Sequence, residues 1–209
     1  MTKRWRRLTV WLHILTSVGW MSQALALCVL LSAGYAADDP SVRDAATSMA
    51  HVLDTRLLGS MADASAFTGI MLAAATPWGF FRNWWVLVKL AITLVQLYLG
   101  IFLLSPQLTA SLTTGPAPAQ LAGTALMASA IAFQAWLSVA KPWGKVRGRP
   151  GPAPGPAPWW VFAATVTGAL ADLAFAAVVG HPMPLLSLVL LAAGLIRRPR
   201  WARPVSSTA

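Results

Sequence analysis

The chain consists mainly of long apolar stretches that are separated by short polar or proline-containing segments. Five of these stretches cover residues 8–34, 41–75, 84–104, 121–140 and 159–179. Each is long enough to cross a hydrocarbon layer of about 30 Å as a helix, because a helix rises about 1.5 Å per residue. A shorter apolar run covers residues 185–196 and precedes a basic tail. The pattern predicts an all-α, polytopic transmembrane helical bundle.

A break in composition divides the predicted bundle near residue 149. Residues 149–158, RPGPAPGPAP, alternate proline with small residues. Such a segment cannot be helical, and it leaves too many backbone polar groups unpaired for lipid. We therefore expect a four-helix transmembrane core over residues 1–148, a cytoplasmic linker over 149–158, and a C-terminal transmembrane hairpin with a basic tail over 159–209. This arrangement has six crossings; if residues 185–196 do not cross, it has five.

Local signals predict the ends of the second helix and one loop. Pro40 and Ser41 are typical of a helix start, with Ser41 as N-cap, and Asp44 three residues later would complete a rough capping box. Pro77 and Gly79 indicate that this helix ends near residue 75. The uncharged stretch 105–120, SPQLTASLTTGPAPAQ, follows the third apolar run, and we expect a loop there.

The basic residues are distributed asymmetrically between the two sides of the predicted bundle. With the N-terminus in the cytoplasm, the inner segments 1–7, 76–83, 141–158 and 197–209 hold every lysine and arginine except Arg43, Arg56 and Lys89, and no acidic residue. Most tryptophans fall near the same boundary. The net charge of +10 is therefore a topology signal, and we expect no nucleic-acid partner.

The first apolar run is longer than the core of a signal peptide, so a retained helix is favoured over a cleaved leader.

Three motifs of the core resemble a known group of sequences. They are LTVWLHILTSVGW at 8–20, FTGIMLAAATPWGFFRNWWVLVKLAIT at 67–93 and SVAKPWGK at 138–145. Over residues 8–148 the chain resembles small bacterial multi-pass integral membrane proteins that are distantly similar to the membrane domain of copper-resistance D proteins. The resemblance implies a helical bundle in the bacterial cytoplasmic membrane. It does not indicate a biochemical activity. The proline-rich linker and the C-terminal hairpin depart from the four-helix pattern.

Several polar side chains fall within or beside the predicted spans, where ionisable groups need a partner or a function. The ionisable ones are Asp63, Asp172, Arg56 and Lys89. Asp63 and Asp172 lie at similar depth, and if their faces meet they would form a carboxylate pair able to relay protons or bind a cation. The alternative is that each bonds to a nearby hydroxyl. Arg56 shares a helical face with Asp63, whereas Lys89 is close enough to the inner boundary to extend its ammonium group to water. Three glutamines are expected to form interhelical hydrogen bonds: Gln23, Gln96 and Gln134.

Two methionine–histidine pairs occur on the predicted outer side. Met49 precedes His51 by two residues, and Met183 follows His181 by two. Thioether and imidazole groups suit copper(I), so these four residues are candidate copper ligands. His51 and His181 could alternatively hold haem b, because two histidine ligands must face each other at the same membrane depth. His13 is near the inner end of its helix and therefore cannot pair with His51 or His181. In a third interpretation these side chains bind no ligand. The sequence therefore does not determine whether the protein holds a cofactor.

The sequence contains no motif of a soluble enzyme. It has no glutamate and no GxSxG, HExxH or phosphate-binding loop. We expect a non-enzymatic integral membrane protein that contacts lipids and is accessory to a membrane complex, with another membrane protein or a second copy as its partner. Two alternatives use the residues named above: a small transporter or copper-handling protein, and a b-type membrane cytochrome.

Overall fold

The computed structural model describes residues 2–146 and 157–179, together with the isolated positions 186, 189 and 193. The elements in chain order are α1 (Thr2–Ala36), α2 (Pro40–Leu53), the π-helical turn η1 (Asp54–Leu58), α3 (Gly59–Ala75), α4 (Trp84–Leu99), the π-helical turn η2 (Gly100–Leu104), α5 (Ser105–Thr114), α6 (Pro118–Ala140) and α7 (Trp159–Val179). No β-strand occurs among these residues. The predicted all-helical fold class is confirmed for this part of the chain.

Five continuous helical runs in the described part are long and apolar enough to cross a membrane. α2, η1 and α3 form one run of 36 residues, and α4, η2 and α5 form another of 31 residues. The other three runs are α1, α6 and α7. This is the architecture of a multi-pass membrane protein. The predicted sixth span lies outside the described residues apart from the three isolated positions, so the choice between five and six crossings stays a prediction.

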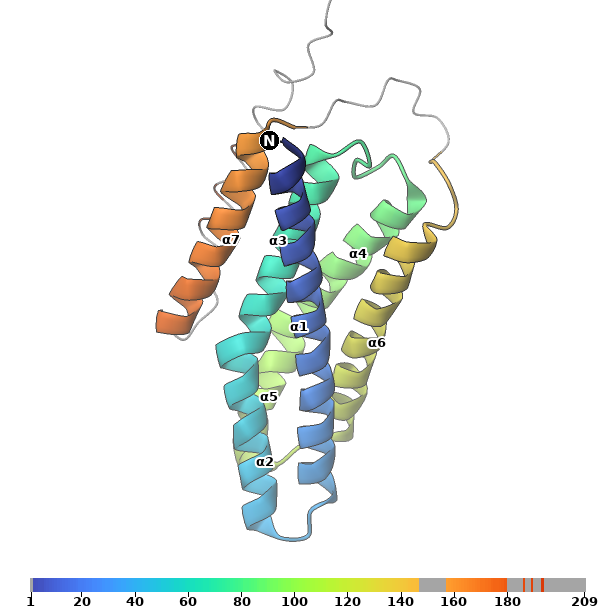
Figure 1. Ribbon diagram of the computed structural model, residues 1–209. Coiled ribbons are helices and arrows are strands. Elements are labelled where there is room, and N and C mark those ends of the chain that lie inside the picture. The colour runs from blue at the N-terminus through green and yellow to red at the C-terminus, as the bar shows by residue number, and fades with distance from the viewer. Residues whose placement is uncertain (1, 147–156, 180–185, 187–188, 190–192, 194–209) are drawn as a thin grey trace, which may run out of the picture.

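α1 lies at the centre of the bundle and packs against α2, α3, α6 and α7 (Figure 1). Its side chains form buried clusters with other helices at several levels, among them Leu12 with Phe67 and Phe162, Trp20 with Ala62 and Ile131, and Leu31 with Ala50 and Leu108. Alanines occupy much of the buried face of α3, which allows neighbouring helices to approach closely. The central position of α1 means that every other long helix is positioned relative to it, directly or through one neighbour.

The predicted inner segments that the structure describes lie together at one end of the bundle. This end, called the upper end here, holds the start of α1, the α3–α4 turn, the end of α6 and the start of α7 (Figure 1). Backbone hydrogen bonds join the connecting segments there: Trp84 N–H to Gly144 O at 3.3 Å, Val146 N–H to Arg82 O at 3.0 Å, and Ala157 N–H to Ala75 O at 3.0 Å. The basic connecting segments are therefore held on one side of the bundle.

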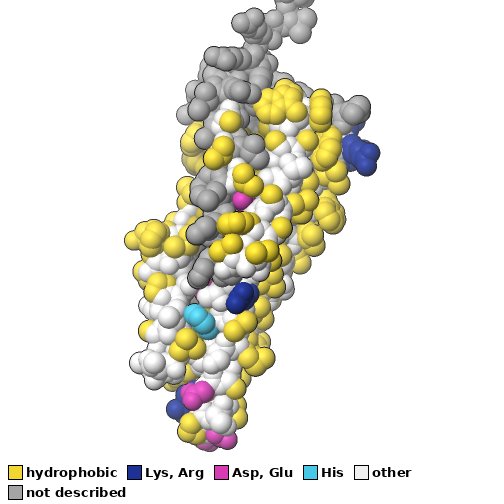
Figure 2. Space-filling model, turned by 90° about the vertical axis from the view of Figure 1, so that its left-hand side faces the viewer, with side chains coloured by type: hydrophobic (Ala, Val, Ile, Leu, Met, Phe, Trp, Pro, Cys, Tyr) yellow, Lys and Arg dark blue, Asp and Glu magenta, His cyan; other side chains and the backbone are white. Residues whose placement is uncertain are grey.

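The opposite end of the bundle holds the α1–α2 loop. Figure 2 shows acidic side chains at this lower end and many hydrophobic side chains along the rest of the visible surface. Exposed aliphatic and aromatic residues are common along the helices, for example Val29 and Leu126, which are 67% and 64% exposed. A surface of this kind suits a helix bundle that is surrounded by lipid.

The start of α2 differs from the prediction. Asp39, and not Ser41, is the N-cap: its Oδ1 accepts a hydrogen bond from the Ser41 backbone N–H at 2.8 Å. Pro40 is in the first turn, where a helix needs no backbone donor. The hydrogen bonds from Ser41 lower the pKa of the Asp39 carboxyl, because they stabilise its charged form. The aspartate one residue before the proline was the stronger start signal.

The predicted loop over residues 105–120 is wrong for residues 105–114, which form α5, and for residues 118–120, which begin α6. Pro106 lies in the first turn of α5, directly after the π-helical turn η2. The wider π-helical turn changes the hydrogen-bonding pattern just where the proline lacks an N–H, so the helical run continues through it. The Ser105 hydroxyl donates to Asp54 Oδ2 at 2.7 Å and thereby links η1 to the start of α5. The run ends at Thr114, and the next residue, Gly115, has a φ of +79°.

Candidate functional site

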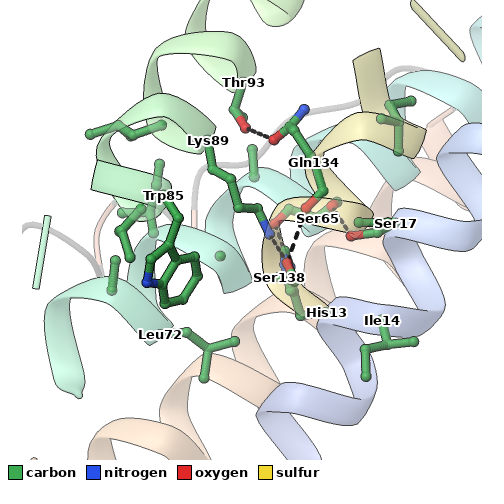
Figure 3. A pocket seen from close by; sticks show the side chains of 18 of the residues that line it. His13, Ile14, Ser17, Ser65, Leu72, Trp85, Lys89, Thr93, Gln134 and Ser138 are labelled. Atoms are coloured by element: carbon green, nitrogen blue, oxygen red, sulfur yellow. Dashed lines mark hydrogen bonds between the residues drawn. The ribbon is translucent and has the colours of Figure 1, made fainter. Parts of the chain in front are cut away.

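A cavity of about 550 Å³ lies between α1, α3, α4 and α6 near the upper end of the bundle. Apolar side chains form most of its wall, and Trp78 and Phe80 of the α3–α4 turn border it. The polar side chains that line it are His13, Ser17, Ser65, Lys89, Thr93, Gln134, Ser138 and Lys141. Figure 3 shows polar side chains that converge from the four helices. An apolar cavity of this size with a few convergent polar groups is typical of a ligand-binding site.

His13 of α1 is held on the cavity wall by α3. Its Nδ1 lies 3.0 Å from the Ser65 carbonyl oxygen and 3.1 Å from Thr68 Oγ1. Because a carbonyl oxygen only accepts, Nδ1 carries the proton, and Nε2 of the neutral ring has a free lone pair. Gly69 makes room for the ring, since a Cβ at this position would lie 2.9 Å from His13 Cε1. The geometry therefore fixes one tautomer and leaves Nε2 without a partner among the described residues.

Lys89 of α4 points toward α6. Its Nζ donates a hydrogen bond to Ser138 Oγ, and Ser138 in turn donates to the Gln134 carbonyl oxygen at 3.1 Å. The side chain is half-buried. Among the residues that the structure describes, no carboxylate is its partner, and no aspartate lines the cavity. The ammonium group is thus a positive charge at the polar end of an otherwise mainly apolar space.

Hydrogen bonds join α4 and α6 beside the cavity. Thr93 donates to Gln134 Oε1 at 2.9 Å, and Gln134 Nε2 donates to Gln96 Oε1. Gln96 Nε2 donates to the Met127 carbonyl oxygen at 3.0 Å. The predicted interhelical hydrogen bonds of Gln96 and Gln134 are confirmed. Gln23 of α1 differs, because its buried Oε1 has no partner within the described part of the chain.

α7 packs against α3 and brings Asp172 toward Asp63. The two carboxyl groups are close enough to interact electrostatically, and they repel each other when both are ionised. Asp172 Oδ1 also accepts a hydrogen bond from the backbone N–H of Leu186 at 3.3 Å. Arg56 is exposed and forms no ion pair with Asp63 in the described part of the chain. A proton or cation pathway through these residues stays a prediction.

The structure places one of the two methionine–histidine pairs. Met49 of α2 is 61% exposed, and His51 is half-buried with Nδ1 unpartnered among the described residues. His181 and Met183 lie outside the described residues. In the part of the chain that is described, no group of three or more His, Cys, Asp or Glu side chains could hold a metal ion. The copper and haem b sites stay predictions.

The fold and the cavity define a class of protein: an all-helical, multi-pass membrane protein with a polar-lined cavity between four of its helices. No protein-family model, no curated protein and no solved structure matches this chain. The resemblance to bacterial membrane proteins that the motifs indicate therefore stays a prediction.

The sequence identified only part of this cavity. The sequence indicates Lys89 as a candidate, whereas it suggests His13 only as a haem ligand that cannot meet either of the other two histidines at one level. A usable signal was present, because His13 and Ser17 are four residues apart on α1 and therefore share a helical face. On α3, Ser65 and Thr68 are three residues apart and provide a matching polar face. The missing information was that these two faces meet.

Proposed function

We propose that this chain is a non-enzymatic integral membrane protein of the bacterial cytoplasmic membrane that binds a small amphiphilic molecule between α1, α3, α4 and α6. The observation that carries the proposal is the cavity of about 550 Å³, with its mainly apolar wall and its convergent polar groups. Native interiors are otherwise packed to high density, so a space of this size needs a reason. Binding of a molecule with an apolar body and a polar head supplies one.

The borders of the cavity support entry from the lipid. Ile14 and Val18 of α1 and Val139 of α6 line it, and they are 55%, 53% and 85% exposed. These aliphatic side chains on the outer surface of the bundle would face acyl chains in a membrane. A ligand that partitions into the bilayer can therefore reach the cavity sideways, without crossing the bundle.

The charge pattern supports an orientation in which the cavity opens near the inner leaflet. Lys141 lines the cavity and belongs to one of the predicted inner segments, and the other described inner segments lie at the same upper end. Positive segments are retained on the cytoplasmic side. In this orientation the N-terminus is cytoplasmic, and the bound molecule comes from the inner leaflet.

A matched pair of variants tests the proposed binding. Ala135 of α6 lines the cavity, whereas Ala132 of the same helix does not, and both are exposed. The protein is purified in a mild nonionic detergent, and the extracted small molecules are compared by mass spectrometry. An amphiphile should copurify with the wild type and with Ala132→Phe, and it should be reduced by about tenfold or more in Ala135→Phe, whose ring occupies the cavity. Identical extracts from the wild type and Ala135→Phe would overturn the proposal.

A second candidate function is a proton or cation pathway, which the electrostatic interaction between Asp63 and Asp172 favours. Proton flux into vesicles that contain the purified protein would then depend on Asp63. Asp63→Asn should abolish the flux, and Arg56→Gln should keep it because Arg56 is exposed and unpaired in the described part of the chain. Equal flux through the wild type and Asp63→Asn would exclude this pathway.

A further inference from the structure

The cavity holds a positive charge that no acidic side chain among the described residues balances. Its ionisable lining residues are His13, Lys89 and Lys141. Lys89 donates to Ser138 and has no carboxylate partner in the part of the chain that is described. Burial of an ammonium group without a counter-charge is unfavourable, because the low dielectric of the interior does not replace its hydration. A ligand that brings one negative charge to Lys89 would remove this penalty.

The number of free donors fits a carboxylate. An ammonium group has three N–H donors, and Ser138 accepts one of them, which leaves two for a ligand. His13 is close enough to Lys89 to interact with it electrostatically, and Figure 3 shows both side chains directed to the same part of the cavity. Lys141, the other lysine of the lining, is exposed at the end of α6, whereas Lys89 is half-buried. With a neutral His13, the Lys89 ammonium therefore balances one negative charge inside the cavity. This favours a carboxylate over a phosphate monoester, which carries close to two charges at neutral pH.

The remainder of the cavity fits a hydrocarbon chain. Leu72 of α3, Trp85 of α4 and Ile131 of α6 are buried side chains of the wall. Ile14 and Val139 border the cavity and are exposed on the outer surface of the bundle. A molecule with its head group at Lys89 can therefore extend its chain along an apolar wall toward the lipid.

We propose that the cavity binds a single-chain amphiphilic carboxylate of the fatty-acid type. Its carboxylate accepts hydrogen bonds from Lys89 Nζ, and its chain passes between Ile14 and Val139 to the surrounding lipid. The inference rests on the proposed function, which it deepens by naming the class of ligand. It is independent of the carboxylate pair on α3 and α7.

The test is equilibrium binding of tritiated dodecanoate to the detergent-purified full-length chain, measured by scintillation proximity at a pH where the acid is ionised. Unlabelled dodecanoate and dodecanol compete for the site, and Ala135→Phe defines non-specific binding. Dodecanol should compete about ten- to a hundred-fold more weakly than dodecanoate, because it lacks the charge-assisted hydrogen bond. Lys89→Met should remove this preference, and Lys89→Arg should keep it.

The possible results separate the two levels of the proposal. Equal competition by dodecanol and dodecanoate for the wild type would overturn the carboxylate site and leave an amphiphile cavity. Dodecanoate binding that is unchanged in Ala135→Phe would overturn both. The comparison of the two competitors on the wild type requires no variant, so it remains decisive even if Lys89→Met fails to fold.

Discussion

At the residue scale, Gly69 packs closely against the His13 ring at the cavity. In a helix, replacing glycine with alanine is normally favourable, because it reduces the freedom of the unfolded chain. Here the new Cβ would lie 2.9 Å from His13 Cε1. We predict that Gly69→Ala destabilises the protein by about 1–3 kcal/mol, the usual cost of overpacking. Thermal unfolding of the detergent-purified protein measures the effect.

Two further variants identify the origin of that loss. Gly100→Ala is the matched control, because the nearest atom to its new Cβ is Met127 Cε at 4.0 Å. This variant should be neutral or slightly stabilising. In a His13→Ala background the loss caused by Gly69→Ala should disappear, since the ring is gone. An undiminished loss in that background would show that the ring is not its cause.

The N-cap of α2 gives a pH-dependent prediction. The pKa of Asp39 is lowered by hydrogen bonds from Ser41, so ionised Asp39 stabilises the folded state above its unfolded-state pKa, and this contribution is lost as the pH falls through the folded-state pKa. Asp39→Asn keeps an acceptor oxygen but removes the charge at the start of the helix. We expect a lower unfolding temperature than that of the wild type at neutral pH and no difference in acid. A constant difference at every pH would contradict the assignment.

At the element scale, the hydrogen-bonded glutamines determine how α4 and α6 associate. Gln134→Leu removes the donor to Gln96 and the acceptor for Thr93. We predict a loss of about 1 kcal/mol in the free energy of unfolding, within the range measured for polar contacts between membrane helices. Gln96→Leu combined with Gln134→Leu should cost less than the sum of the single substitutions, because both act on one network. Strict additivity in thermal or denaturant unfolding would argue that the two side chains act independently.

The sequence predicted the apolar helices well and their polar ends less well. The run 159–179 coincides with α7, because tryptophans begin it and glycine and proline follow it. α5 was missed because serine, threonine and proline are common in loops, and local composition does not reveal a π-helical turn that carries the chain past Pro106. The cap of α2 was misplaced by two residues, since Asp39 and Ser41 are both good caps.

At the scale of the whole molecule, the cavity could not be predicted because it depends on which helical faces meet. α1 is apolar on nearly all sides, so hydropathy does not reveal that His13 faces α3 and not lipid. Lys89 could be identified as costly within a span, but its contact with Ser138 depends on the packing of α4 against α6. Sequence spacing gives the depth of a residue in a bundle, whereas contacts between helices give its partners.

The proposed route of the ligand depends on the orientation of the bundle. The upper end holds the cavity and the basic connecting segments, and the α1–α2 loop with its aspartates lies at the other end. If the upper end is cytoplasmic, the lipid-facing opening of the cavity, which Ile14 and Val139 border, lies at the inner leaflet. If the bundle is inverted, the ligand must come from the outer leaflet, and the positive-inside pattern is violated.

The most direct test of this account is cysteine labelling in intact cells with a membrane-impermeant maleimide. The single native cysteine, Cys28, is first replaced by alanine. Cysteine is then introduced at the exposed positions of Asp38, in the α1–α2 loop, or Lys145, beside the α3–α4 turn. We predict that Asp38→Cys is labelled in intact cells and that Lys145→Cys is labelled only after the membrane is permeabilised. Labelling of Lys145→Cys in intact cells, with Asp38→Cys protected, would contradict the account.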